Sequence, residues 1–376
     1  MFCKFCGNQI DDNSVFCSKC GKTLQAGDSA GQGDIPAQTP IVPQQIPAAP
    51  PQVPAAPSSK NNTLKIVLII VFAVLFLGLA AIGGYIFVMY KAVSGEAVSE
   101  KSISENGEND LTGKTFTAQL PNGVKLEMVR IPNCKKDGFM MGSPESEADR
   151  KDDETRHKVY LTKDFYLGKY EVTQAQWQAL MGTDVYQQKN KGNMWGDVTG
   201  VGGQHPMYFV NYNEALDFCN ELNKRGYAPE GWKFTLPTEA QWEYACRAGT
   251  TTPFSYGSRS DVYKMNFAGN YPYGGAGKGV YRDSTVEVGS LGYKNAFGLY
   301  DMHGNVWEWC LDHYSSRFYS NGATDPLCTT GSGRVLRGGS WRDRAARDCR
   351  SACRGGGAPT YRIYYVGFRL ALVPSQ

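Results

Sequence analysis

The stretch Gly298-Leu-Tyr-Asp-Met-His-Gly-Asn-Val-Trp-Glu-Trp309 is the most informative part of this 376-residue sequence. It alternates side-chain oxygens with glycine and two tryptophans, a composition typical of an irregular turn that leads into a core. Hard cations such as Ca²⁺ take several oxygen ligands of this kind. The stretch therefore predicts a loop-rich domain in which both tryptophans pack inside.

Further phrases lie on both sides of this stretch, and in their order they resemble the formylglycine-generating enzyme (sulfatase-modifying factor) family. The resemblance covers Phe116 to Leu372 and implies an α+β domain with a C-type-lectin-like fold, poor in regular structure. The phrases are Gly138-Phe-Met-Met-Gly-Ser143, Tyr170-Glu-Val-Thr173, His205-Pro206, Leu236-Pro-Thr-Glu-Ala-Gln-Trp-Glu-Tyr244, Arg337-Gly-Gly-Ser-Trp341 and Gly367-Phe-Arg369.

Three helices are predicted from capping residues and stop signals. Thr173 precedes a helix at 174–181, Asn213 precedes one at 214–225, and Thr238 precedes one at 239–247. Glycine follows each of them within two residues. Short strand candidates and glycine-rich loops make up the rest of residues 114–376, which we expect to form one domain.

The resemblance also implies a copper site, because the oxidases of this family hold Cu(I) with two cysteines just after the Gly-Gly-Ser phrase. In this chain Asp343 and Asp348 stand at those two positions. Carboxylates are poor ligands for Cu(I), which prefers thiolates. Cys349 and Cys353 are the nearest thiols. They are either a relocated catalytic pair, or one buried core thiol and one surface or pocket thiol, or a disulfide in an oxidising compartment. If the domain is an enzyme, we expect a formylglycine-generating type of oxidase.

The family resemblance gives the stretch at 298–309 a structural calcium ion. The roles carried over are side-chain ligands at Asp301 and Glu308 and carbonyl ligands at Gly304 and Val306. A second calcium site of the family begins at a pair that matches Asn266-Phe267, and its other half has no clear counterpart in the sequence.

Residues 342–365 interleave arginines with tyrosines, the residue types that dominate binding hot spots. Relatives diversified by retroelements vary this same part of the chain, between a Gly-Gly-Ser-Trp phrase and a final Gly-Phe-Arg. The alternative is a solvated basic face on which Arg350, Arg354 and Arg369 tie down loops. The predicted ligand surface consists of Arg342, Asp343, Arg344, Arg347, Asp348, Tyr361, Tyr364 and Tyr365.

The first twenty-five residues contain two Cys-x-x-Cys pairs, formed by Cys3 with Cys6 and by Cys17 with Cys20. Four thiolates at this spacing suit a tetrahedral structural zinc ion, and so short a segment needs the metal in order to fold. Two disulfides are the alternative. The segment resembles the small zinc ribbons at the start of many bacterial membrane proteins, and we expect a structural or partner-binding role.

A linker rich in proline and alanine follows at 26–63, and such a sequence has no core of its own. Residues 66–90 carry no charge and are long enough to cross a bilayer, so we predict one transmembrane helix at 64–91. A polar stalk occupies 92–113. Lysines without nearby acids precede the span, which predicts a cytoplasmic N-terminus and an extracytoplasmic C-terminal domain in the cell membrane.

The net charge of +3 and the 20% charged residues argue against nucleic-acid binding through bulk electrostatics. Three hypotheses remain for the function. The first is a membrane-anchored module that binds a protein or peptide ligand. The second is an oxidase. The third is a sensor whose ligand binds outside while the zinc ribbon meets a cytoplasmic partner.

Overall fold

The computed structural model describes residues 114–192, 196–318, 323–342 and 346–375, and these form one domain built on three sheets. No helix within the described ranges is long and apolar enough to span a bilayer. The linker, the predicted membrane helix at 64–91 and the stalk lie outside the described residues.

The predicted zinc ribbon at 1–25 also lies outside the described residues. The structure therefore does not test the four predicted zinc ligands, and their assignment stays a prediction. These ligands are Cys3, Cys6, Cys17 and Cys20.

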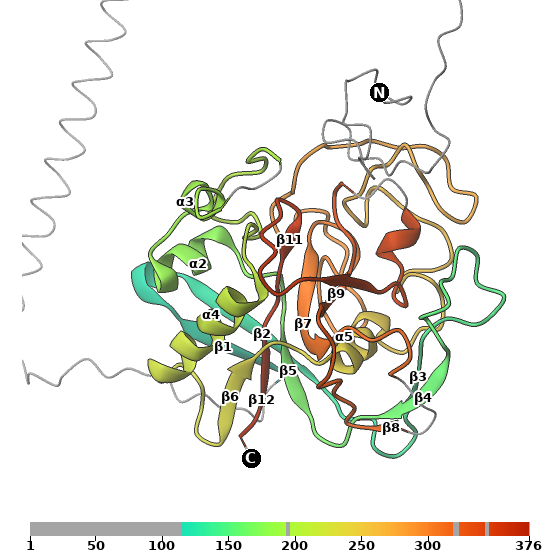
Figure 1. Cartoon of the computed structure of the whole chain (residues 1–376), viewed down its shortest axis with the longest axis horizontal. Helices are drawn as coiled ribbons and strands as arrows, with labels where there is room; N and C mark the ends of the chain where they lie inside the picture. Colours follow the sequence, from blue (N-terminus) through green and yellow to red (C-terminus); the bar gives the residue numbers. More distant parts are fainter. Residues whose placement is uncertain (1–113, 193–195, 319–322, 343–345, 376) are drawn as a thin grey trace, which may run out of the picture. The chain divides into compact units, whose positions relative to one another are not determined.

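The largest sheet joins the two ends of the domain. Its strands are β1 (Thr115–Gln119), β2 (Lys125–Ile131), β5 (Phe165–Gly168), β12 (Ala371–Pro374) and β6 (Trp232–Thr235), in that order and all antiparallel. A short 3₁₀ turn, η1 (Pro121–Gly123), closes the hairpin between β1 and β2. Because β12 lies in the middle of this sheet, the last strand of the chain is needed to complete it (Figure 1).

Helices α2 (Gln174–Met181) and α4 (Tyr212–Lys224) pack with this sheet in the main apolar cluster. The prediction of α2 with its Thr173 cap is confirmed. Helix α4 begins two residues earlier than predicted, because Asn211, and not Asn213, forms the capping box with Glu214. A short helix, α3 (Val185–Lys189), was not expected from the sequence.

Helix α5 (Glu239–Arg247) has the predicted bounds and the predicted Thr238–Gln241 capping box. It contacts β7 (Trp307–His313) and β9 (Arg334–Arg337), the central strands of a four-stranded sheet that also contains β10 (Gly355–Gly357) and β11 (Val366–Gly367). A third sheet comprises β3 (Phe139–Met141), β4 (His157–Tyr160) and β8 (Ala323–Thr324).

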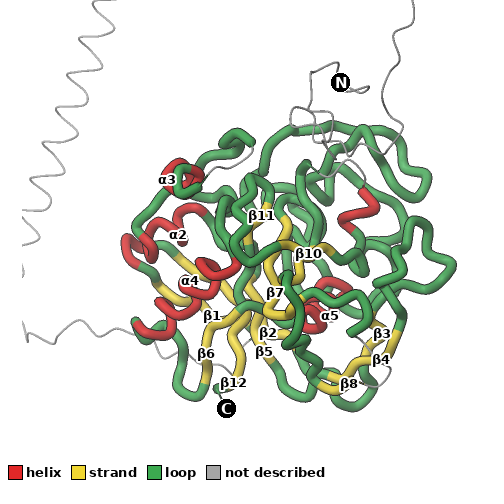
Figure 2. Tube along the Cα trace, in the orientation of Figure 1, coloured by secondary structure: helices red, strands yellow, loops and turns green. Residues whose placement is uncertain are grey.

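Loops make up much of the remainder, particularly between α5 and β7 (Figure 2). The predicted mixture of helices, sheets and long irregular segments is therefore confirmed. Trp309 is fully buried and Trp307 is 8% exposed, as expected for core residues. Gly339 has a φ of +74°, and a Cβ added to it would lie only 2.6 Å from the Cys349 sulfur. Glycine at this position thus lets the loop after β9 lie against η2 (Ala346–Cys349).

Candidate functional site

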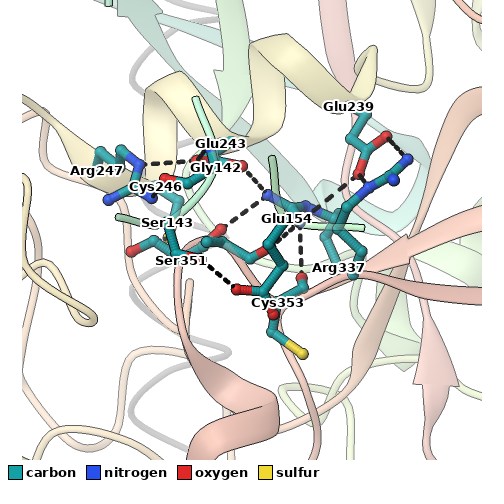
Figure 3. A network of polar contacts seen from close by, with 12 residues as sticks. Gly142, Ser143, Glu154, Glu239, Glu243, Cys246, Arg247, Arg337, Ser351 and Cys353 are labelled. Carbon is teal, nitrogen blue, oxygen red and sulfur yellow. Dashed lines mark hydrogen bonds and ion pairs between the residues drawn. The ribbon is translucent and has the colours of Figure 1, made fainter. Parts of the chain in front are cut away.

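A fully buried arginine, Arg337 at the end of β9, links helix α5 to the C-terminal segment (Figure 3). Its Nη2 donates to Glu243 on α5 and also to the carbonyl of Ser351 at 2.8 Å. Its Nη1 donates to the carbonyls of Ala352 and Cys353, at 3.0 and 2.7 Å. One guanidinium thus fixes both a helix and three consecutive backbone carbonyls.

Other buried charges continue this network on both sides. Arg354 forms a bidentate pair with Glu239, with N–O distances of 2.6 and 2.8 Å. Arg350 donates to Glu147 and to Glu154, two acids from the loop between β3 and β4. Within the described residues four buried arginines face four buried glutamates: Arg247, Arg337, Arg350 and Arg354 against Glu147, Glu154, Glu239 and Glu243. We call these eight residues the buried ion network.

The structure tests part of the prediction for the arginines in the C-terminal segment. Arg350, Arg354 and Arg369 hold loops together, as the alternative predicted, but all three are buried and so do not form a solvated basic face. Glu147 and Glu154 were not singled out in the sequence, because nothing local shows that a glutamate in a loop will be buried.

The two candidate catalytic cysteines belong to different apolar clusters. Cys349 packs with Phe254 and neighbouring residues, whereas Cys353 packs in the main cluster. Both are fully buried, and burial raises the pKa of Cys353 to about 12, which disfavours the thiolate that a copper ion needs. None of the seven described cysteines is in a disulfide bond.

Asp348, at the second expected copper position, is paired with a lysine. Lys151 Nζ lies 3.3 Å from Asp348 Oδ1 and 3.5 Å from Cys353 Sγ. The first position, Asp343, lies outside the described residues. An aspartate–lysine pair beside a protonated thiol does not fit Cu(I), and we derive no copper chemistry for this place.

The predicted ligand surface divides into separate groups. Arg347 and Asp348 face Asp149 and Lys151. Arg342 instead lies over the rings of Tyr364 and Tyr365, at 5.1 and 5.5 Å. Tyr361 is 53% exposed and has no ring contact to either group among the described residues, and Arg344 lies outside them.

Arg342 covers one end of a continuous series of aromatic rings. Tyr281 stacks on Trp341 with centroids 6.4 Å apart, Trp341 lies 5.7 Å from Tyr364, and Tyr364 lies 5.0 Å from Tyr365. We call Tyr281, Trp341, Tyr364 and Tyr365 the aromatic row. Tyr281 was missed in the sequence because it lies sixty residues before the others, in a loop without a motif.

Two of the predicted calcium ligands, Asp301 and Glu308, lie near another buried arginine, Arg369. Both carboxylate oxygens of Glu308 accept hydrogen bonds from Arg369, and one of them also accepts from Trp242 Nε1. Glu171 and Asp301 are buried near the same guanidinium, so three acids share one positive charge. Burial raises the pKa of Asp301 to about 6.

The donors at this place suit a hard cation. Asn266 pairs with Gly304 through a backbone bridge, and its side-chain oxygen is buried with no hydrogen-bond partner in the described part of the chain. Oxygen donors and a surplus of buried carboxylates are the chemistry that a calcium ion prefers, although both Glu308 oxygens are already hydrogen-bonded to Arg369 or Trp242. The side chains alone do not form a cage, since the described residues contain no group of three or more His, Cys, Asp or Glu arranged to hold a metal.

The sequence profile of the sulfatase-modifying factor enzyme 1-like domain matches residues 119–373. The chain belongs to this family. A zinc-ribbon profile matches residues 2–24, which include Cys3, Cys6, Cys17 and Cys20. This match supports the predicted ribbon, although the positions of the four sulfurs lie outside the described residues.

Among relatives, the formylglycine-generating enzyme of Streptomyces coelicolor is 35% identical over 184 residues, which cover 46% of this chain and 54% of that protein. The chain spans about half the length of the curated relatives that it matches first. Treponema denticola variable protein 1 superposes with a TM-score of 0.56 and 27% identity, over 70% of this chain and all of that one. PvdO from Pseudomonas aeruginosa gives 0.52 and 28%, over 66% and 94%.

Replacing Glu243 by glutamine should cost about 3–5 kcal/mol of unfolding free energy, because it leaves Arg247 buried without its counter-charge and removes the nearer of the two acids paired with Arg337. All seven tryptophans lie in this domain, so urea unfolding of the full chain can be followed by their fluorescence. Glu221→Gln, at a partly exposed pair with Arg225, is the control and should cost far less, because solvent screens an exposed ion pair. Equal losses in the two variants would contradict the assigned role of the network.

Proposed function

We propose that this protein is a membrane-anchored binding module, which keeps the fold of its family, C-type-lectin-like in type, without the copper chemistry. The observation that carries the proposal is the aromatic row with Arg342 beside it. Tyrosine and tryptophan supply large contact areas with few rotatable bonds, arginine supplies a planar charged group, and all three dominate binding hot spots. Trp341 is itself buried, so it supports the row from below while Tyr281 and Arg342 are exposed. We expect a protein or peptide ligand at this surface.

An oxidase is the competing function, and the thiols weigh against it. Cys349 and Cys353 lie in different apolar clusters. Gly339 lies next to the sulfur of Cys349, whereas Lys151 lies next to the sulfur of Cys353. A relocated copper site would require both thiols at one ion. A sensor that couples the outer ligand to the zinc ribbon is compatible with the binding module.

The membrane anchor at 64–91 and the cytoplasmic zinc ribbon are part of the proposal. They rest on the uncharged run at 66–90, on the lysines before it and on the match of residues 2–24 to a zinc ribbon. In this arrangement the aromatic row belongs to the part of the chain outside the cell membrane.

Spheroplasts that carry the full chain should enrich specific peptides from a random phage-displayed library. Arg342→Gln and Tyr281→Ser should each weaken binding of an enriched peptide about tenfold, the loss expected at a hot spot. Tyr186→Ser is the control, since Tyr186 is 53% exposed but belongs to α3 and not to the aromatic row.

Unchanged binding in Arg342→Gln and Tyr281→Ser would refute the assignment of the ligand surface. Binding that occurs only to inside-out vesicles would refute the proposed orientation.

We also propose that Asp301, Glu308 and the carbonyls of Gly304 and Val306 hold a structural calcium ion. The ion would offset the surplus of negative charge around Arg369. Calcium at about 100 times its dissociation constant should then stabilise the domain by about 2.7 kcal/mol. Asp301→Asn should abolish this gain, whereas Glu221→Gln should keep it, as measured by unfolding with and without a chelator. No effect of calcium on the wild-type chain would contradict the site.

A further inference from the structure

A hollow lies next to Tyr281 in the chain. It has a volume of about 630 Å³ and is formed by the single chain segment 256–280. Val280 lines it, and the next residue, Tyr281, begins the aromatic row. We call this hollow the loop pocket. It was not expected from the sequence, and of the residues singled out there only Phe267, from the pair matched to a second calcium site, lines it.

Positive charge predominates around the loop pocket. Arg259, Lys264 and Lys278 line it together with one acid, Asp261. Asp261 pairs with Lys264 at 3.5 Å. Arg259 and Lys278 have no ion pair with any residue that the structure describes, so two positive charges face the hollow without a counter-charge.

A further cation, Arg282, contacts a residue that lines the loop pocket. Arg282 Nη2 donates to the carbonyl of Val262, a lining residue, at 2.9 Å. Its Nη1 is buried and has no hydrogen-bond partner among the described residues. A guanidinium without a carboxylate in a partly desolvated place strengthens the positive potential of the pocket.

The walls of the loop pocket are held by close backbone contacts. The Gly279 N–H donates to the carbonyl of Gly269 at 2.8 Å. An added Cβ on Gly279 would come within 2.7 Å of Val262, and one on Gly269 within 2.2 Å of the Val280 carbonyl. Such packing gives a hollow that exists before any ligand arrives, as is usual for binding sites.

We infer that the loop pocket binds a phosphate or sulfate group. Two uncompensated cations with a third behind the wall suit a doubly charged oxyanion, and arginine and lysine are the side chains that recognise such groups. The rings of Tyr256 and Tyr263 line the same hollow and offer apolar contact to whatever carries the anion. This site lies beyond the proposed peptide surface and does not depend on it.

Gly277 allows a direct test. It lines the pocket, and an added Cβ meets no atom within 4 Å. Gly277→Glu should therefore place a negative charge at the site without disturbing the fold, and Gly277→Gln is the neutral control of equal size. Titration calorimetry of the full chain would use inorganic phosphate, inorganic sulfate, glucose 6-phosphate and unphosphorylated glucose.

We expect the anions to bind, glucose not to bind, and Gly277→Glu to weaken anion binding at least tenfold while Gly277→Gln changes it less than about threefold. Equal affinity for phosphate and glucose 6-phosphate would mean that the anion alone is recognised. Tighter binding of the sugar phosphate would mean that an ester is the natural ligand.

Absence of anion binding would overturn the inference, and so would an equal loss in both Gly277 variants. Lys135→Gln, at an exposed lysine outside the pocket, should leave the affinity unchanged, and an equal loss there would indicate general surface charge instead. Arg342→Gln should not alter anion binding. A failure of the loop pocket is therefore separable from a failure of the peptide surface.

Discussion

The Arg337 guanidinium is the interaction on which the rest of the domain depends. It is fully buried, and it satisfies Glu243 on α5 and three carbonyls at 351–353 at the same time. Burying a charge is costly unless it is paired and fully hydrogen-bonded. The remaining members of the buried ion network are paired with opposite charges, and among the described residues only Nε of Arg337 lacks a partner within the network's arginines. A loop-rich chain thus acquires a fixed shape where regular secondary structure is scarce.

This constraint explains why the chain keeps the fold of its family although it lacks the two cysteines that hold copper in the family's oxidases. The network holds residues 346–354 in place through Arg350 and Arg354, and no thiolate takes part in it. Asp348 can stand at an expected copper position because Lys151 supplies its counter-charge. The residues of the proposed ligand surface lie outside this network, and one fold can host many functions.

Local signals in the sequence predicted local structure well. Helices α2 and α5 were located with their caps, because a capping box is written in four consecutive residues. The α4 cap was misplaced by two residues, since Asn211 and Asn213 are both suitable caps and only the position of Glu214 decides between them. The sequence did not show which distant segments would meet. The contact of Tyr281 with Trp341 and the loop pocket depend on how loops fold against one another.

The most direct test of the account is a search for oxidase activity in the full chain, supplied with Cu(I), oxygen and a cysteine-containing sulfatase peptide. Mass spectrometry would detect the aldehyde product. The account predicts no aldehyde and no tight copper binding by the domain, because the two buried thiols belong to different apolar clusters and Asp348 is paired with Lys151. Turnover with tight copper binding, both lost in Cys349→Ala or Cys353→Ala, would contradict it and establish a relocated oxidase site.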